Sequence, residues 1–376
     1  MLSKSPFIAV FLHVYCIQNT VFQVVGEVRA LNAESCAQHS DGHEIRRNQT
    51  VSAETKDKEV TKVQSRPVII DTDPGQDDAF AILLALASPA LEVLGLTTVA
   101  GNMGLAQTTD NARRIVELAG HADIPVCAGA DRPLMRQPRP VPEIHGDTGI
   151  DGWDWEEARR GPEAESAVDF LVRTLRAHPT PVTLIVLGPQ TNIALALSVA
   201  PDIKRNIERI VFMGGGFFEG GNMTPAAEYN ILVDPEAARI VLKSGLPITA
   251  VPLDCTHATA SPVHWSHQLA AHDGEVMQAC AGMMEFFEIY GNKKYGTASR
   301  PLHDAVAVAA LLWPELFEGK LCPVDVECAG ELTTGMTVVD WLRQTGRTDN
   351  CLWLNGCTDS AEVYRRMEAA LATLAA

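Results

Sequence analysis

From residue 66 onward the sequence alternates short apolar runs with stretches that have a helical pattern. The runs PVIID, LEVLGLTTVA and VTLIVLG each precede a predicted helix, at 77–86, 105–118 and 191–199 respectively. The runs RIVFMGGG and PITAVPL continue the series. Strands that alternate with helices are typical of βαβ units, which build parallel sheets. The chain is therefore predicted to be an α/β protein, with an open, mostly parallel, Rossmann-like sheet flanked by helices.

The second half of the chain adds further elements to this pattern. Helices are predicted at 235–244, after Ser261 and at 304–312. The segment GKLCPVDVECAGELTTGMTVVDW alternates polar and apolar residues and predicts an antiparallel excursion. In SAEVYRRMEAALATL the apolar residues recur at helical spacing, so this helix is expected to pack on the sheet. With no internal repeat in the sequence, residues 66–376 are predicted to form a single domain.

The first 65 residues differ in composition from the rest. The apolar segment PFIAVFLHVYCI is followed by a polar, charge-mixed stretch without sustained helical or strand periodicity. Residues 1–65 are therefore predicted to be a disordered extension or a targeting segment. The apolar segment is too short to span a bilayer, and His13 interrupts it. We expect a cytoplasmic protein, or a secreted or organellar one if this segment is a targeting signal.

Charge and cysteine content exclude several classes of partner. The formal net charge of -17 argues against binding to nucleic acid or to an anionic membrane surface, because both need clustered Lys and Arg. The nine cysteines are scattered and never spaced as CxxC, so neither a zinc site nor a disulfide framework is indicated. Mostly reduced thiols favour a reducing compartment.

The segment VIIDTDPGQDDAFAILLAL places four carboxylates where the first strand ends and the next helix begins. These are Asp71, Asp73, Asp77 and Asp78. In open α/β sheets ligands bind at the carboxyl ends of the strands. Crowded carboxylates repel one another unless a positive charge compensates, and a set of oxygen donors alone favours calcium or magnesium. The alternative is that these residues cap the helix and shape the turn around Pro-Gly.

Two other motifs give weaker signals. Haloacid-dehalogenase phosphatases also begin with a strand that ends in two aspartates two residues apart. In those enzymes a Thr or Val is expected after the second aspartate, but here the residue is Pro74. MGGG after the strand that ends near Met213 is typical of a phosphate-binding turn, yet neither GxGxxG nor GKS/GKT follows. A tight backbone turn is the simpler interpretation of these glycines.

The sequence resembles the inosine/uridine-preferring nucleoside hydrolases, whose N-terminal signature DxDPGxDD is matched by DTDPGQDDA. Further matching blocks follow in the family's order: TTVAGN, IHGDTG, LGPQTNIALAL, FMGGG, EGGNMTPAAEYNILVDPEAA and LHDAVAV. They cover roughly residues 66 to 376, so chance agreement is excluded in practice. The resemblance implies the nucleoside hydrolase fold, a nucleoside as substrate, and a homodimer or homotetramer.

The resemblance also implies a calcium site and a catalytic base. The implied ligands are Asp73, Asp78, Asp304 and the backbone carbonyl of Leu187, with Asp73 as the general base that takes a proton from the attacking water. Hydrolysis then yields free nucleobase and ribose through an oxocarbenium-like transition state, which an anionic pocket stabilises. The implied sugar-binding residues are Asp77, Asn102, Met213, Asn222, Glu228 and Asn230.

The leaving nucleobase needs a proton or a strong hydrogen bond, and two histidines are candidates to supply it. His303 directly precedes the implied ligand Asp304, while His145 lies in a block that the resemblance places in a mobile loop over the base. The region EIYGNKKYGTASRP, which contains Tyr290 and Tyr295, resembles the family's second mobile segment. The base preference stays open, and the alternative to an enzyme is a catalytically silent protein that binds ribosides.

Overall fold

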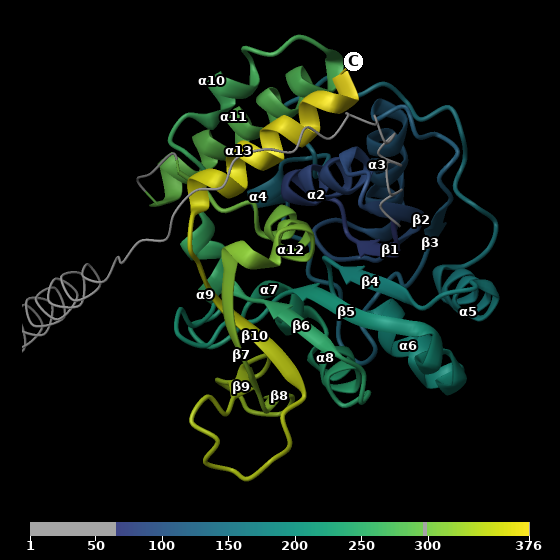
Figure 1. Cartoon of the computed structure of the whole chain (residues 1–376), viewed down its shortest axis with the longest axis vertical. Coiled ribbons are helices and arrows are strands. Elements are labelled where there is room, and N and C mark those ends of the chain that lie inside the picture. Colours follow the sequence, from purple (N-terminus) through teal and green to yellow (C-terminus); the bar gives the residue numbers. More distant parts are fainter. Residues whose placement is uncertain (1–64, 296–298, 376) are drawn as a thin grey trace, which may run out of the picture. The chain divides into compact units, whose positions relative to one another are not determined.

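A central sheet of eight strands organises the protein (Figure 1). The computed structural model describes residues 65–295 and 299–375. The strand order is β3-β2-β1-β4-β5-β6-β10-β7, and all neighbours pair in parallel except β10 and β7. The strands are β1 Arg66–Thr72, β2 Leu91–Thr98, β3 Val126–Ala128, β4 Val182–Val186, β5 Ile207–Met213, β6 Ile248–Val251, β7 Phe317–Cys322 and β10 Cys351–Cys357. The predicted α/β class with a mostly parallel sheet is confirmed.

Helices cover both faces of the sheet. The α-helices are α2 Gln76–Ala87, α3 Leu105–Leu118, α4 Pro142–His145, α5 Ala167–Ala177, α6 Thr191–Val199, α7 Tyr229–Val233, α8 Pro235–Leu242, α9 Leu253–Thr256, α10 Trp265–Leu269, α11 Glu275–Tyr295, α12 His303–Leu312 and α13 Ser360–Leu371. Short 3₁₀ helices are η1 Pro201–Asn206, η2 His257–Thr259, η3 Pro314–Leu316 and η4 Ala372–Ala375. One core contains α2, α3, α10, α11, α12 and α13, and the other contains α5, α6 and α8.

The alternation of side chains along β1 explains this layering. Val68 and Ile70 are buried in the core beneath α2, whereas Ile69 is buried in the core on the opposite face. Successive residues of a strand point to opposite faces, so a strand in the middle of a helix-covered sheet is apolar throughout. This is why the strands appear in the sequence as continuous apolar runs.

Most of the predicted elements are found. The helices predicted at 105–118 and 191–199 have these bounds in the structure. The predicted excursion overlaps most of β7 and contains the antiparallel pair β8 Val324–Val326 and β9 Thr337–Val339. Several elements were not predicted, among them the strands β3 and β10 and the helices α5 and α11. The strand CLWLNGC mixes polar residues into its pattern, and α11 is apolar over much of its circumference, so neither has a clear period.

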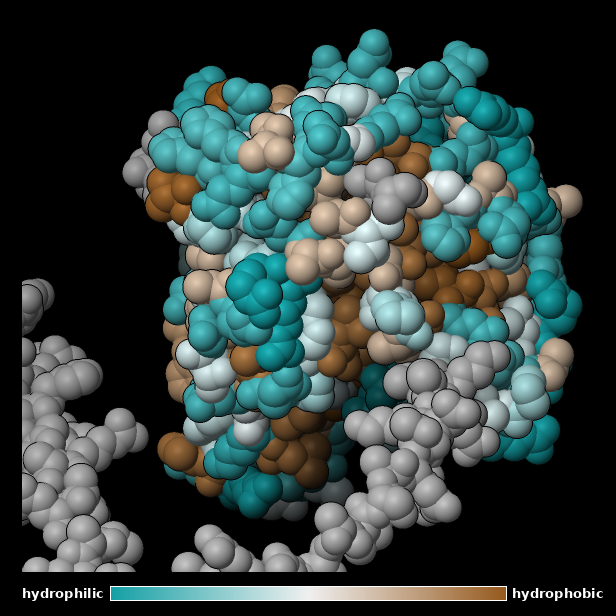
Figure 2. Space-filling model, turned by 45° about the horizontal axis from the view of Figure 1, so that its top comes forward, coloured by the Kyte–Doolittle hydropathy of each residue, from teal (hydrophilic) through white to brown (hydrophobic). Residues whose placement is uncertain are grey.

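The surface fits a strongly charged chain. On the face drawn in Figure 2, hydrophilic residues cover most of the surface, and hydrophobic ones gather mainly in a recess. None of the helices within the described ranges combines the length and apolar character required to cross a membrane. The N-terminal segment with its apolar run lies outside the described residues, and so does the NQT sequence at Asn48, an N-glycosylation acceptor motif in secreted proteins.

Candidate active site

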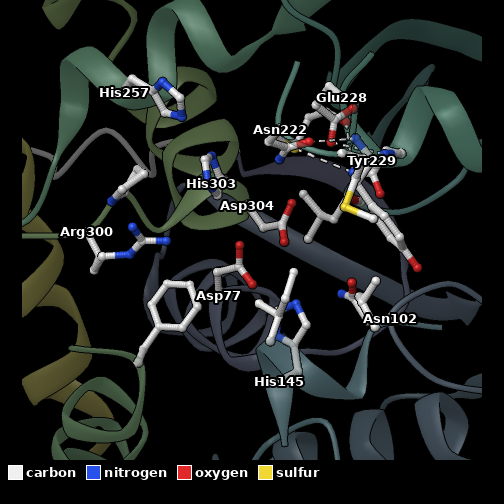
Figure 3. A pocket seen from close by; sticks show the side chains of 18 of the residues that line it. Asp77, Asn102, His145, Asn222, Glu228, Tyr229, His257, Arg300, His303 and Asp304 are labelled. Carbon is white, nitrogen blue, oxygen red and sulfur yellow. Dashed lines mark hydrogen bonds between the residues drawn. The ribbon is translucent and has the colours of Figure 1, made fainter. Parts of the chain in front are cut away.

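A pocket of about 480 Å³ opens at the carboxyl edge of the sheet. Its residues come from the carboxyl ends of β2, β4 and β5, from the starts of α2, α7 and α12, and from α4, η2 and α11. The strand order reverses between β1 and β4, and such a switch point is where open α/β sheets bind their ligands. Figure 3 shows Asp77 and Asp304 near the centre of the pocket, with Asn222 and Glu228 on one side and His257, Arg300 and His303 on another.

Asp73 lies behind the pocket wall, between two glycines. Its Oδ2 accepts a hydrogen bond from the backbone N–H of Asn102 at 2.7 Å, and the side chain is 1% exposed. A Cβ atom at Gly101 or Gly188 would lie about 1.9 or 2.2 Å from its carboxylate oxygens. Its Oδ1 is buried without a hydrogen-bond partner in the described part of the chain. The two glycines thus make room for a carboxylate that keeps one oxygen unpaired.

Three further carboxylates gather beside it. Asp77, Asp78 and Asp304 each offer an oxygen, and these oxygens lie within 4.8 Å of one another. Asp78 also accepts hydrogen bonds from the Thr72 hydroxyl and from the backbone N–H of Gly75, the residue that caps α2. The helix-capping interpretation is therefore correct for Asp78, and capping and clustering occur together.

Burial shifts the acidity of these groups. Burial, together with the nearby charge of Asp78, raises the pKa of both Asp73 and Asp304 well above the usual range. Burial and the charge of Asp77 raise the pKa of Asp78 to about 6. A shift in this direction means that the cluster favours protons or another cation in place of four free negative charges.

The donor set fits a hard cation such as Ca²⁺. Asp73 Oδ1, Asp77 Oδ1 and Asp304 Oδ1 are buried oxygens without hydrogen-bond partners among the described residues. Unpaired buried carboxylate oxygens are costly, and neither Cys nor His belongs to the group of Asp77, Asp78 and Asp304. The carbonyl of Leu187 accepts a hydrogen bond from Asn230 Nδ2 at 2.7 Å.

Asp71 differs from its neighbours although it belongs to the same motif. Its Oδ1 accepts hydrogen bonds from the Thr97 hydroxyl and from Asn192 Nδ2, the latter at 2.7 Å. Burial raises its pKa to about 7. These contacts tie the ends of β1 and β2 to α6, so Asp71 supports the sheet edge and does not line the pocket.

Polar side chains form the wall beside α7. Glu228 caps this helix, accepting hydrogen bonds from the backbone N–H groups of Asn230 at 3.0 Å and Gly215 at 2.9 Å. Burial raises its pKa to about 7. Asn222 Oδ1 accepts from the backbone N–H of Tyr229 at 3.0 Å, so its amide nitrogen is left for a ligand. Such fixed polar groups suit a ligand with several hydroxyls.

The histidines stand on other walls. His303 Nδ1 and the Thr256 hydroxyl are 2.8 Å apart, and the His257 ring lies 5.7 Å from the His303 ring, centroid to centroid. Burial lowers the pKa of His303 to about 3 and that of His145 to about 4. At neutral pH both imidazoles are uncharged and can act only through hydrogen bonds or transient proton transfer.

The structure brings the predicted site residues together. The pocket is lined by Asp77, Asn102, His145, Leu187, Met213, Asn222, Glu228, Asn230, His303 and Asp304, while Asp73 and Asp78 are buried directly beneath. The side chains of Tyr290 and Tyr295 lie outside the described residues. Among the lining residues that the sequence did not identify are Tyr229, His257, Phe287 and Arg300. His257 follows closely on β6, and a search of every strand end would have found it.

Comparisons with known proteins agree with this geometry. Residues 68–365 match the family model for inosine-uridine preferring nucleoside hydrolase. A pyrimidine-specific ribonucleoside hydrolase RihA of Shewanella baltica is 46% identical over 293 residues, which cover 78% of this chain and 92% of that protein. The structure of a purine-preferring ribonucleoside hydrolase from Gardnerella vaginalis superposes with a TM-score of 0.77 at 31% identity, covering 82% of this chain and 99% of the other. A plant nucleoside hydrolase gives 0.76, with the same identity and coverage.

Proposed function

Because this chain belongs to the inosine-uridine preferring nucleoside hydrolase family, we propose that its buried aspartates hold Ca²⁺ and that Asp73 and His303 carry out the proton transfers. The chain is a hydrolase that acts on the N-glycosidic bond of ribonucleosides. Beyond this activity, we propose calcium as the cofactor, a role for each site residue and a preferred nucleobase.

Asp73 is the proposed general base. The observation that carries this assignment is its buried Oδ1, which has no hydrogen-bond partner in the described part of the chain. Asp73, Asp78, Asp304 and the carbonyl of Leu187 are the proposed calcium ligands, and the unpaired oxygen of Asp77 beside them adds a fifth candidate. Bound Ca²⁺ would make a water molecule more acidic and orient the ribose diol. Asp73 then accepts the proton of the attacking water.

The remaining lining residues hold the sugar and the leaving base. Asn102, Asn222 and Asn230 offer fixed amides to the ribose hydroxyls, and Glu228 offers a buried carboxylate. Cleavage of the C1′–N bond leaves positive charge on the ribosyl ring, which the surrounding carboxylates stabilise. The contact with Thr256 engages Nδ1 of His303, so Nε2 is the ring nitrogen that remains to protonate the leaving base.

We propose pyrimidine ribonucleosides as the preferred substrates. The support is that relatives named pyrimidine-specific ribonucleoside hydrolase are 45–46% identical to this chain, whereas the purine-preferring hydrolase of known structure is 31% identical. Residues at the base side of the pocket, such as His257 and Arg300, are candidates to set this preference.

A nucleoside panel tests the proposal. Release of free base and reducing sugar is measured from uridine, cytidine, inosine, adenosine and guanosine, first with Ca²⁺ and then after chelation. We expect release that is fastest with uridine or cytidine and that chelation abolishes. Release that survives chelation would refute the calcium requirement. Tight binding of nucleosides without any release would instead support a catalytically silent riboside-binding protein.

A further inference from the structure

Gln76 is the variable position of the motif DPGQDD, and its side chain is completely buried in contact with His145. One end of its amide lies 2.9 Å from the backbone oxygen of His145 and 3.3 Å from that of Asp151. The other end lies 2.8 Å from Nδ1 of the His145 ring. A single side chain thus holds both the backbone and the ring of the same histidine.

The chemistry of these contacts fixes which atom is which. Carbonyl oxygens only accept hydrogen bonds, so the end of Gln76 that faces the two backbone oxygens must be its NH₂ group. The end that faces the ring of His145 is therefore the oxygen Oε1 of Gln76, which can only accept a hydrogen bond. His145 must then donate through Nδ1–H, and a neutral imidazole carries no second proton. Its Nε2 is left as a lone-pair acceptor.

The surroundings of His145 keep the ring in this place. A Cβ atom at position 75 would lie 2.5 Å from His145 Nδ1, so the glycine there lets the ring pack against the backbone. The ring of Phe287 is stacked on that of His145, with centroids 6.4 Å apart and an interplanar angle of 20°. In Figure 3 the ring of His145 borders the pocket next to Asp77 and Asn102.

We infer that Gln76 is a positioning residue that locks His145 in the Nδ1–H form, so that Nε2 accepts a hydrogen bond from an O–H or N–H group of the bound nucleoside. In this form His145 selects substrates that present a donor and does not protonate the leaving base, which leaves that role to His303. The inference rests on the proposed function for the identity of the ligand, but the state of the ring does not depend on it.

The test compares Gln76→Met with Gln278→Met in the calcium-loaded protein. Gln278 is a matched control because its amide also donates to two backbone oxygens, those of Ala270 and His272, and it has no hydrogen bond to a ring within the described ranges. ¹⁵N NMR of the labelled histidines, with His145→Gln to assign the signals, reports which ring nitrogen is protonated. We expect Nδ1–H in the wild type and in Gln278→Met, and a mixture of both forms in Gln76→Met.

Kinetics provide the second readout. Loss of one well-placed hydrogen bond lowers kcat/KM by about tenfold, so we expect this loss in Gln76→Met and wild-type values in Gln278→Met. A wild-type His145 that is protonated at Nε2 would overturn the inference. An unchanged ring state and unchanged kinetics in Gln76→Met would also overturn it. If wild-type His145 carries its proton on Nδ1 but the protein releases no base from any nucleoside, the role of Gln76 in fixing the Nδ1–H form is supported and the proposed function is refuted.

Discussion

The two ends of the pocket are built from different kinds of structure. The aspartate end, formed by Asp73, Asp77, Asp78 and Asp304, stands on the end of β1 and on the first turns of α2 and α12. At the histidine end, made of His257, Arg300 and His303, only His303 belongs to a long helix. Regular elements hold side chains more precisely than connecting segments, which vary more readily. We therefore propose that the aspartate end and His303 perform the shared chemistry, and that His257 and Arg300, which lie outside long helices, choose the base.

The largest effect is expected at the aspartate end. Asp73→Asn removes the proposed base while keeping the size of the side chain, and kcat should fall by about 1,000-fold or more. The matched control is Asp71→Asn, which keeps the Oδ1 acceptor for Thr97 and Asn192 and should retain most of the activity. Steady-state kinetics and thermal melts of both variants provide the measurement. Equal losses of activity in the two variants would remove the distinction between these neighbouring aspartates.

A change at His303 tests the histidine end. His303→Gln should lower kcat for uridine by about 100-fold, because the leaving base is no longer protonated. Hydrolysis of 4-nitrophenyl riboside serves as the control, since nitrophenolate leaves without a proton and its release should be nearly unaffected. If both substrates lose activity to the same extent, His303 does not act as the acid.

A larger residue beside Asp73 tests whether the exact position of this carboxylate matters at the aspartate end. Gly188→Ala would place a methyl group about 2.2 Å from Asp73 Oδ1, so the carboxylate has to move. A displacement of about 1 Å near the reacting groups typically costs about 100-fold in rate, and kcat/KM should fall by that order. The control is Gly104→Ala, where a Cβ atom meets nothing within 4 Å. Wild-type kinetics in Gly188→Ala would show that the position of this carboxylate is not critical.

The two ends of the pocket also differ in how well the sequence predicts them. The aspartate end falls inside motifs that directly follow or open regular elements. Strand and helix patterns located Asp73 and Asp78, and the family resemblance added Asp304. His257 and Arg300 lie in connections without periodicity, and only the fold brings them to the pocket. The sequence also could not show that one carboxylate oxygen of Asp71, Oδ1, is held by Thr97 and Asn192, because hydrogen bonds between distant segments leave no local pattern.

The smallest effect is expected for base preference. His257→Ala removes a ring from the histidine end without touching the aspartates, so the ratio of kcat/KM between uridine and inosine should change by about tenfold or less. The change in that ratio, measured by competition between the two substrates, is the informative quantity. A uniform loss with both nucleosides would place His257 in the shared chemistry and contradict the division between the two ends.

Calorimetric titration of the metal-free protein with Ca²⁺ tests the central claim most directly. We predict one ion per chain, binding that is lost in Asp73→Asn and retained in Asp71→Asn, and release of protons on binding. Because burial raises the pKa of Asp78 to about 6 and holds that of Asp73 and Asp304 well above the usual range, protons compete with the ion, and binding should be tighter at pH 8 than at pH 6. Absence of binding, or equal binding in both variants, would contradict the proposal that the unpaired oxygens of these aspartates form a calcium site.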